Sequence, residues 1–398
     1  MITRFLPFLL IVSLVAPCME VDLSAPSFPA IVPGLNTTDA WVQMTIAINF
    51  LGFAISGILY GPLSDSFGRR PVMIYGNALL LIGAAGCVFA PSIELLLVSR
   101  FIQGMGAAAS AVVAFAIVAD AYEGVKSTRF IGIMNSALTA LMAIAPVLGS
   151  FVFKAVGWRG SYGFVAILCL VSWLLLVIGL PETKHKREPF HLKKIILDYK
   201  RLLSSTPFMV LSFVPTVLCA GYFSFIACSP FWYMDEMHLS VMAYALYQGS
   251  IVAVFSLVSI FSSKLIKHFG ERRNVTYGMG FSFIGTCMIL FMGLMRIPSP
   301  MFITLGMIVF ATGFAALYPV VFSYSLNMFP EIRGAASSVL MAIRMIVVST
   351  GVGLGSLFYN GQALSIGVIL IICTLLSLIF LSSILKALGL SQFSHNAQ

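Results

Sequence analysis

The sequence predicts an all-α membrane protein with twelve transmembrane helices in two related six-helix halves. Of its residues, 60% are hydrophobic and only 9% are charged, whereas soluble domains contain about 25% charged residues. Twelve apolar stretches each reach the length of about 20 residues that a membrane-spanning helix needs. Two short motifs also recur at nearly the same offset along the chain, as expected for an internal repeat.

Hydropathy alone places the twelve spans. In chain order they cover residues 5–29, 40–61, 71–90, 95–118, 130–152, 162–181, 207–229, 241–262, 275–294, 301–325, 336–357 and 362–385. The six spans before residue 182 form a predicted first bundle, residues 1–181, and the six after residue 206 form a second, residues 207–398.

Basic residues fix the predicted orientation, because cytoplasmic loops are enriched in Lys and Arg. With a cytoplasmic N-terminus, 18 of the 23 basic residues lie on the inside, and three lie outside, Lys154, Arg159 and Arg296. We therefore expect a multi-pass protein of the bacterial inner membrane with both termini in the cytoplasm. The basic residues of these loops account for the net charge of +9, so we expect the lipid bilayer and not nucleic acid as the partner. We also expect a monomer.

Residues 182–206 form the longest polar stretch and link the predicted bundles. Apolar residues recur in it at helical spacing between lysines, namely Leu192, Ile195, Ile196, Tyr199, Leu202 and Leu203. This pattern is typical of an amphipathic helix on the inner membrane surface. A solvated basic linker is the alternative that the sequence leaves open.

The repeated motifs relate the two halves. Phe67-Gly68 aligns with Phe269-Gly270, and this alignment places Lys267 opposite Asp65. The run from Leu148 to Phe153 matches the run from Leu354 to Tyr359. Each match alone is weak, but together they favour two six-helix repeats.

A tight cytoplasmic hairpin joins the second and third spans. It runs from Gly61 to Pro71 and carries one carboxylate and two guanidinium groups between apolar runs. Gly68 permits a positive φ, and Pro71 suits the first turn of a new helix.

These motifs resemble the major facilitator superfamily along the whole chain. The hairpin is similar to the family's loop motif at Gly61, Asp65, Gly68, Arg69 and Arg70. Other matches are the run from Arg100 to Gly106, the fifth-helix element with Pro146 and Gly149, Asp22 to Pro26, Gly157 to Arg159, and Leu180 to Thr183. The last three resemble the bicyclomycin and chloramphenicol resistance branch of drug/proton antiporters.

That resemblance implies the major facilitator fold and secondary active transport by alternating access. Two departures from the branch pattern stand out. An Arg-Asp pair often ends the fourth helix, but here Ala119 precedes Asp120. In the fifth-helix element, Ala145 and Ser150 replace two glycines, although both are small enough for close helix contact.

Four charges lie inside predicted spans: Glu20, Asp22, Arg100 and Arg344. Each costs about 2.5 to 3.5 kcal/mol or more when unpaired near the bilayer centre. At 1.5 Å per residue, Asp22 lies about 25 Å from the inner end of the first span and Arg100 about 8 Å from the outer end of the fourth. These depths are similar, so we expect Asp22 and Arg100 to face a common cavity. An inert ion pair between the two helices is the alternative.

Asp22 is the first candidate for proton coupling, because it matches the family pattern, and Glu20 is the second. The two residues are about 200° apart around a helix, so only a distorted helix would point both into a cavity. No histidine lies in any span, so a proton relay has to use carboxylates. The seven cysteines have no close pair, and we expect no metal and no cofactor, with the proton motive force as the energy source.

Arg344 has two open assignments: it binds an anionic group of the substrate, or it pairs with Glu20. Aromatic and methionine side chains in the spans suit a bulky, partly apolar small molecule. The candidate substrate-binding residues are Arg100, Arg344, Asn49, Gln103, Tyr222, Phe223, Tyr247, Gln248, Tyr318, Met341 and Met345.

The family resemblance gives the hairpin a gating role. The resemblance places Asp65 near the inner end of the eleventh helix, and it brings Arg69 or Arg70 within reach of Asp120. These contacts would hold the two halves together on the cytoplasmic side. The alternative is that the two arginines only set the topology.

The sequence therefore predicts proton-coupled efflux of drug-like or amphipathic molecules. Proton-coupled transport of a metabolite or siderophore, in either direction, remains the rival, favoured by Arg344 and the altered fifth helix. A non-transporting sensor is a further alternative. An enzyme is not expected, because no span offers a histidine or paired cysteines for catalysis or metal binding.

Overall fold

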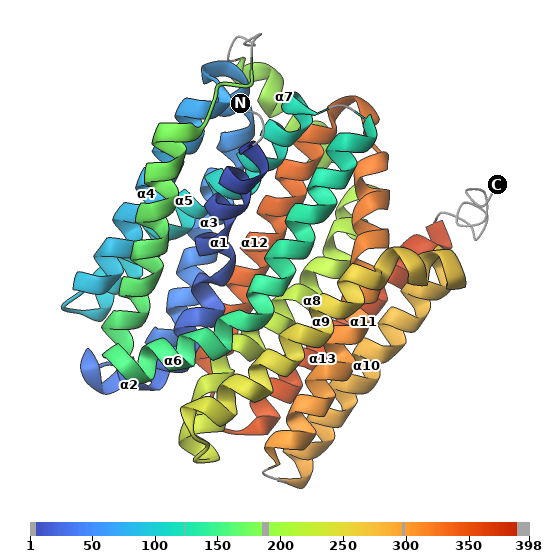
Figure 1. Cartoon of the computed structure of the whole chain (residues 1–398). Coiled ribbons are helices and arrows are strands. Elements are labelled where there is room, and N and C mark those ends of the chain that lie inside the picture. Colours follow the sequence, from blue (N-terminus) through green and yellow to red (C-terminus); the bar gives the residue numbers. More distant parts are fainter. Residues whose placement is uncertain (1–4, 123, 185–190, 297–298, 388–398) are drawn as a thin grey trace. The chain divides into compact units, whose positions relative to one another are not determined.

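The computed structural model describes residues 5–122, 124–184, 191–296 and 299–387, and these residues are almost entirely helical (Figure 1). The chain packs into two compact units, residues 1–195 with 240–245, and residues 196–239 with 246–398. The predicted linker, residues 182–206, includes 185–190, which lie outside the described residues. Its limits stay a prediction.

The first unit contains seven helical segments. They are α1 (Leu6–Ser24), the 3-10 turn η2 (Ala25–Ser27), α2 (Phe28–Gly34), α3 (Asp39–Phe67), α4 (Arg69–Phe89), α5 (Ile93–Ala121) and α6 (Gly124–Gly179). Within this unit α5 packs against both α3 and α4, and α1 packs against α6.

The second unit follows the amphipathic helix α7 (Leu192–Leu203), which crosses the boundary between the units. Its segments are α8 (Thr206–Pro230), the π-helical η3 (Phe231–Glu236), α9 (Val241–Phe269), α10 (Glu271–Met295), α11 (Pro300–Asn327), the 3-10 turn η4 (Pro330–Ile332), α12 (Arg333–Phe358) and α13 (Ala363–Ala387). Here α8 packs against α11, α12 and α13, and α10 packs against α11 and α13.

Eleven helices in the described residues are long and apolar enough to span a membrane. One of them, the 51-residue stretch Arg129–Gly179, is about 76 Å long at 1.5 Å per residue, more than twice the bilayer core. Gly157 breaks it with φ 72° and ψ −176°. The stretch therefore supplies two spans, and the predicted total of twelve is confirmed.

The first span differs from its prediction in where it is distorted. Pro17 lies inside α1 without ending it, and the helix becomes 3-10 only at Ala25. Glu20 and Asp22 consequently lie on regular helix, yet each is only 2% exposed. Both are buried because α1 contacts α5 as well as α6, so neighbouring helices cover more than one of its faces.

The two hairpins that the repeat predicts have matching backbones. Helices α3 and α9 are each 29 residues long. Each is followed by a glycine with positive φ, 104° at Gly68 and 78° at Gly270, which begins the next helix. This left-handed conformation favours glycine, and its presence in both units supports the predicted repeat.

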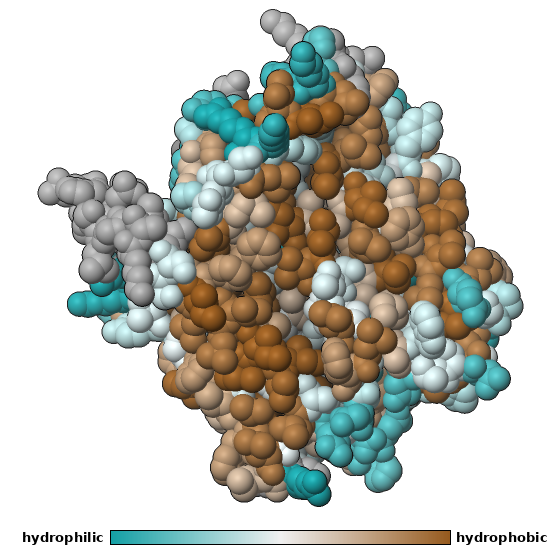
Figure 2. All heavy atoms as spheres, turned by 180° about the vertical axis from the view of Figure 1, so that it is seen from behind, coloured by the Kyte–Doolittle hydropathy of each residue, from teal (hydrophilic) through white to brown (hydrophobic). Residues whose placement is uncertain are grey.

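Apolar side chains dominate the exposed faces of the long helices (Figure 2). A surface of this kind suits lipid and not water. Helix α7 is amphipathic as predicted: Leu202 is fully buried in a cluster with Phe208 and Ala336, while Leu192 and Ile196 are each 55% exposed. That these exposed side chains enter the inner membrane surface stays a prediction.

Candidate functional site

A buried polar cluster lies between α1, α3 and α5 in the first unit. Arg100 on α5 is 0% exposed, and its Nη1 donates to Gln103 Oε1 at 3.0 Å. Glu20 Oε2 lies 3.9 Å from the same Nη1 atom. Asn49 on α3 donates to the backbone oxygen of Arg100 at 3.2 Å, which ties α3 to α5 beside the charges.

This cluster has more hydrogen-bonding capacity than the described residues use. Arg100 Nε and Nη2, Gln103 Nε2 and Glu20 Oε2 are buried and have no hydrogen-bond partner among those residues. The ion pair at 3.9 Å is beyond hydrogen-bonding distance. Buried polar atoms left in this state are costly, so the geometry favours a site that a proton, water or substrate completes.

Glu20, the second choice from the sequence, is the carboxylate that the structure records as paired with Arg100. Asp22 is buried at the same level of exposure, and its predicted approach to Arg100 stays a prediction. Tyr162 on α6, which the sequence analysis did not single out, places its ring 5.7 Å from the guanidinium carbon of Arg100. A cation–π contact of this kind stabilises a desolvated arginine.

Close backbone approaches hold the cluster's helices. A Cβ at Gly104 would overlap the carbonyl oxygen of Asn49, and one at Gly149 would overlap that of Leu23. Gly149 is part of the predicted fifth-helix element, and Leu23 directly follows Asp22. Small residues allow such contact between membrane helices, so this element positions the acidic part of α1 against α6. Pro146 lies inside α6.

The hairpin from Gly61 to Pro71 forms the network that the sequence predicted in part. Arg69, and not Arg70, reaches Asp120, with Nε 2.7 Å from Oδ2, and its Nη2 lies 2.8 Å from Asp65 Oδ1. Lys184, after α6, lies 3.2 Å from the same Asp65 oxygen. These contacts join the ends of α3, α4 and α5. The approach of Asp65 to the eleventh helix and the gating role stay predictions, and so does any such role for Gly61.

Glu182 is a further member of this network that the sequence analysis did not assign. Its Oε1 accepts the backbone N–H of Arg69 at 3.0 Å, and its Oε2 accepts that of Arg70 at 3.3 Å. The carboxylate thus caps α4 from the far end of α6 and faces the positive end of the helix dipole. Arg70 Nη2 in turn donates to the carbonyl of Val177 at 3.0 Å.

Arg344 lies in the second unit, about 17 Å from the start of α12 at 1.5 Å per residue. Its Nη1 donates to the Tyr318 hydroxyl at 2.5 Å, and its Nη2 donates to Met341 Sδ at 3.0 Å. Both acceptors are neutral. Among the described residues of its own unit, no carboxylate pairs with it. Glu20, its alternative partner, belongs to the other unit.

Aromatic rings of α8, α9 and α11 pack together next to Tyr318, the hydrogen-bond partner of Arg344. Tyr222 on α8 stacks on Phe255 of α9 at 6.0 Å between ring centroids. Phe314 on α11 lies 5.6 Å from Phe255 and 6.0 Å from Tyr318. Tyr222 and Tyr318 were predicted candidates, and Phe255 and Phe314 join them only through the fold. Phe223 contacts Tyr222 edge-on at 5.7 Å.

Three further candidates belong to the second unit. Tyr247 on α9 stacks on Tyr233 at 5.7 Å. Its neighbour Gln248 is 1% exposed, and neither end of its amide has a hydrogen-bond partner among the described residues. Met345 is partly exposed on α12, next to Arg344, and no contact in the structure assigns it a role.

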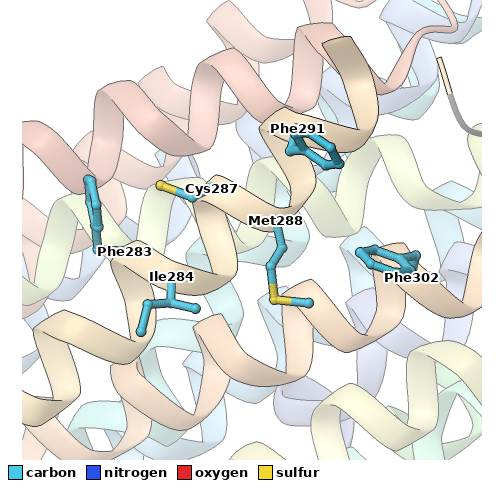
Figure 3. A pocket seen from close by; sticks show the side chains of 6 residues that line it. All are labelled: Phe283, Ile284, Cys287, Met288, Phe291 and Phe302. Atoms are coloured by element: carbon cyan, nitrogen blue, oxygen red, sulfur yellow. The ribbon is translucent and has the colours of Figure 1, made fainter. Parts of the chain in front are cut away.

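An apolar groove lies on α10 and α11 of the second unit (Figure 3). Phe283, Ile284, Met288 and Phe291 of α10 and Phe302 of α11 line it together with Cys287. Several of these side chains belong to the exposed apolar surface. The residues that line the groove are all apolar apart from the thiol of Cys287, so none of them could orient a polar substrate.

Twelve spans in two related sets and charges buried midway along helices define a membrane transporter. The family model described as Major Facilitator Superfamily matches residues 10–352, and the chain belongs to this family.

Similar proteins agree with that assignment. The multidrug resistance protein MdtM of Escherichia coli strain K12 is 24% identical over 394 residues, covering 96% of this chain and 94% of that protein. A chloramphenicol resistance protein of Pseudomonas aeruginosa is 26% identical over 343 residues, covering 85% and 79%. The xylose transporter XylE from Escherichia coli has the same fold, with a TM-score of 0.76 at 14% identity over 96% of this chain and 97% of its own.

Proposed function

We propose that this transporter exports drug-like, amphipathic small molecules in exchange for protons across the bacterial inner membrane. The observation that carries the proposal is the buried Glu20–Arg100 pair, 3.9 Å apart, with unused hydrogen-bonding atoms on both partners. The names of the relatives, multidrug and chloramphenicol resistance proteins, support the substrate class and the resemblance to the bicyclomycin and chloramphenicol resistance branch.

The proposed coupling follows from charge balance in a dry site. While Glu20 is ionised, it compensates Arg100, which is fully buried. Protonation of Glu20 removes that compensation, and a substrate that contacts Arg100 or Gln103 competes for the same groups. Proton and substrate then bind the cluster in turn, and each favours a different state of the protein.

Alternating opening of the protein toward each side of the membrane couples the two fluxes. The proton motive force supplies the energy, about 2.3 kcal/mol per charge for each 100 mV of membrane potential. Buried carboxylates of the first unit serve this step, and the proposal includes no cofactor. Asp22, also buried at 2% exposure, is the second carboxylate candidate.

Substrate-induced proton movement in proteoliposomes tests the proposal, with chloramphenicol as the probe. We expect the wild type to move protons when the drug is added and Glu20→Gln to lose this response. Glu94→Gln, which changes a glutamate in the first turn of α5, is the matched control and is expected to behave like the wild type.

Asp22→Asn distinguishes the two carboxylates. Normal coupling in Glu20→Gln together with lost coupling in Asp22→Asn would move the proton site to Asp22. Normal coupling in both variants would overturn a role for either carboxylate. A wild type without any drug-dependent proton movement would overturn drug/proton exchange.

Arg344 favours a second candidate function, proton-coupled transport of an anionic metabolite. Its guanidinium has only neutral partners in its own unit among the described residues. Proton movement induced by organic anions but by no tested drug would favour this candidate over drug export.

A further inference from the structure

Helix α7 (Leu192–Leu203, Figure 1) carries apolar and basic side chains on the same exposed surface. Lys193 and Lys200 are exposed, and so are four apolar residues. These four are between 51% and 56% exposed, namely Leu192, Ile196, Leu197 and Leu203. Water does not favour so many exposed apolar groups, whereas a membrane interface does. Such an interface lies close by, because the membrane-spanning α8 begins at Thr206.

Packing against the second unit fixes the rotation of α7 about its axis. Leu202 is fully buried in a cluster with Phe208 of α8 and Ala336 of α12, and Tyr199 packs against the same cluster. These two residues of α7 lie about 60° apart around a helix. Together they mark the face that α7 turns toward the protein, and the opposite face is left for another partner.

Lys193 and Lys200 occupy that opposite face. At about 100° per residue, they lie about 160° to 180° from Leu202 around the helix and only about 20° from each other. Along the axis they are about 10 Å apart, so their long side chains can converge on one group. Ile196 lies about 40° to 60° from them on one side, and Leu197 lies equally far on the other. Each ammonium group is therefore flanked by exposed apolar side chains.

No acidic residue of the helix compensates these two lysines. Asp198, the one acid of α7, lies about 140° to 160° away from them around the helix. It lies only about 40° to 60° from Lys194 and Arg201, within the range of a neighbouring turn. Neither Lys193 nor Lys200 forms an ion pair in the part of the chain that the structure describes. Their charges are therefore available to an external anion.

An anionic phospholipid matches both features of this face. Its phosphate supplies the negative charge, and its acyl chains cover the apolar side chains on either side of the lysines. Lysine suits this arrangement, because its stem lies along apolar groups while its ammonium stays at the level of the headgroups. A free phosphate ion would leave the apolar side chains in water, and a zwitterionic lipid has no net charge to offer.

We propose that α7 binds an anionic phospholipid at the membrane surface. Lys193 and Lys200 hold the phosphate of its headgroup, and Ile196 and Leu197 contact its acyl chains. The bound lipid then covers the side of α7 that lies opposite the buried Leu202. The proposal does not depend on the substrate or on the direction of transport.

Hydrogen exchange at the amides of α7 tests the proposal on the full-length protein in lipid nanodiscs. The nanodiscs contain phosphatidylcholine alone, or phosphatidylcholine mixed equally with the anionic phosphatidylglycerol. A lipid that binds only the folded helix slows exchange there. We expect phosphatidylglycerol to slow it about tenfold in the wild type but only about twofold in Lys193→Gln and in Lys200→Gln, because each surface lysine contributes about fivefold. The double variant is expected to show no slowing.

Lys194→Gln is the matched control, because it removes one exposed lysine from the same helix on the side of Asp198. It is expected to keep the full slowing by phosphatidylglycerol. A second control adds sn-glycerol 1-phosphate to nanodiscs of phosphatidylcholine. This soluble phosphate is expected to leave the exchange unchanged, because it has no acyl chain to cover the apolar side chains.

Equal exchange of the wild-type helix in both membranes would overturn the proposal, and so would a slowing that survives in the double variant. An equal loss of slowing in Lys194→Gln would also overturn it, because the effect would then follow the charge of the whole helix and not the site at Lys193 and Lys200. Slowing by sn-glycerol 1-phosphate would replace the lipid with a soluble phosphate as the ligand.

Discussion

Arg100 shows how a single buried charge depends on its surroundings. One of its nitrogens contacts Gln103 and lies 3.9 Å from Glu20, while two others have no hydrogen-bond partner among the described residues. Replacing two buried charges together is often tolerated, whereas removing one of them leaves the other uncompensated. The pair should therefore behave as a unit in stability measurements.

We expect Arg100→Gln to destabilise the protein by about 3 kcal/mol, because it leaves Glu20 buried without its counter-charge. The double variant Glu20→Gln/Arg100→Gln should be more stable than Arg100→Gln. Thermal unfolding in detergent of the wild type, both single variants and the double variant measures the coupling. Additive effects of the two substitutions would show that the ion pair contributes nothing.

At the scale of helices, the contact between α1 and α6 sets the position of the acidic residues. A Cβ at Gly149 would overlap the backbone of Leu23, whereas a Cβ at Gly132 of the same helix meets nothing within 4 Å. We expect Gly149→Val to cost about 1 to 3 kcal/mol of stability by forcing the helices apart. Gly132→Val, measured in the same thermal unfolding assay, is the matched control, and an equal loss there would contradict a specific contact.

The start of α4 is likewise held by a contact from another part of the chain, the Glu182 carboxylate. The helix begins at Arg69, directly after Gly68, and its first two N–H groups are accepted by a carboxylate from beyond α6. Glu182→Gln keeps the shape but removes the charge that faces the helix dipole, so we expect a loss of about 0.5 to 2 kcal/mol. Faster hydrogen exchange at the amides of residues 69 and 70 should accompany it.

The matched control for that exchange measurement is Glu94→Gln, a first-turn glutamate of α5. It should leave the exchange at residues 69 and 70 unchanged. Unchanged exchange in Glu182→Gln would mean that the backbone of α4 does not need this cap.

The spans were predictable from sequence because the bilayer demands long apolar runs. Even the break in α6 falls at Gly157, inside a predicted loop. The partner of Arg100 was harder to predict, since Glu20 and Asp22 share its depth. Which of them faces the arginine depends on the rotation of α1 about its axis, and contacts such as Gly149 on Leu23 set that rotation. The surroundings of Arg344 likewise depend on how α11 and α12 meet, because its partner Tyr318 lies on α11.

At the scale of the whole molecule, the two units share their hairpin backbone but not its charges. In the first unit Asp65 contacts Arg69 at 2.8 Å and Lys184 at 3.2 Å. In the second unit the aligned residue is the exposed Lys267, and the structure records no ion pair in that hairpin among the described residues. Repeated architecture with unequal charges indicates that only one copy carries the ionic network.

We therefore expect Asp65→Asn to slow transport several-fold, because ion pairs of this partly exposed kind contribute about 0.2 to 1 kcal/mol each. Substrate affinity should stay within about twofold, because these ion pairs lie far from the buried binding charges. The Arg69–Asp120 contact at 2.7 Å depends on the same arginine, so the effect should appear in the rate of conformational exchange. Turnover in proteoliposomes and equilibrium binding in nanodiscs measure the two quantities separately. Lys267→Gln, at the aligned position, should change neither. A large loss of affinity with unchanged turnover in Asp65→Asn would assign the hairpin to binding and not to gating.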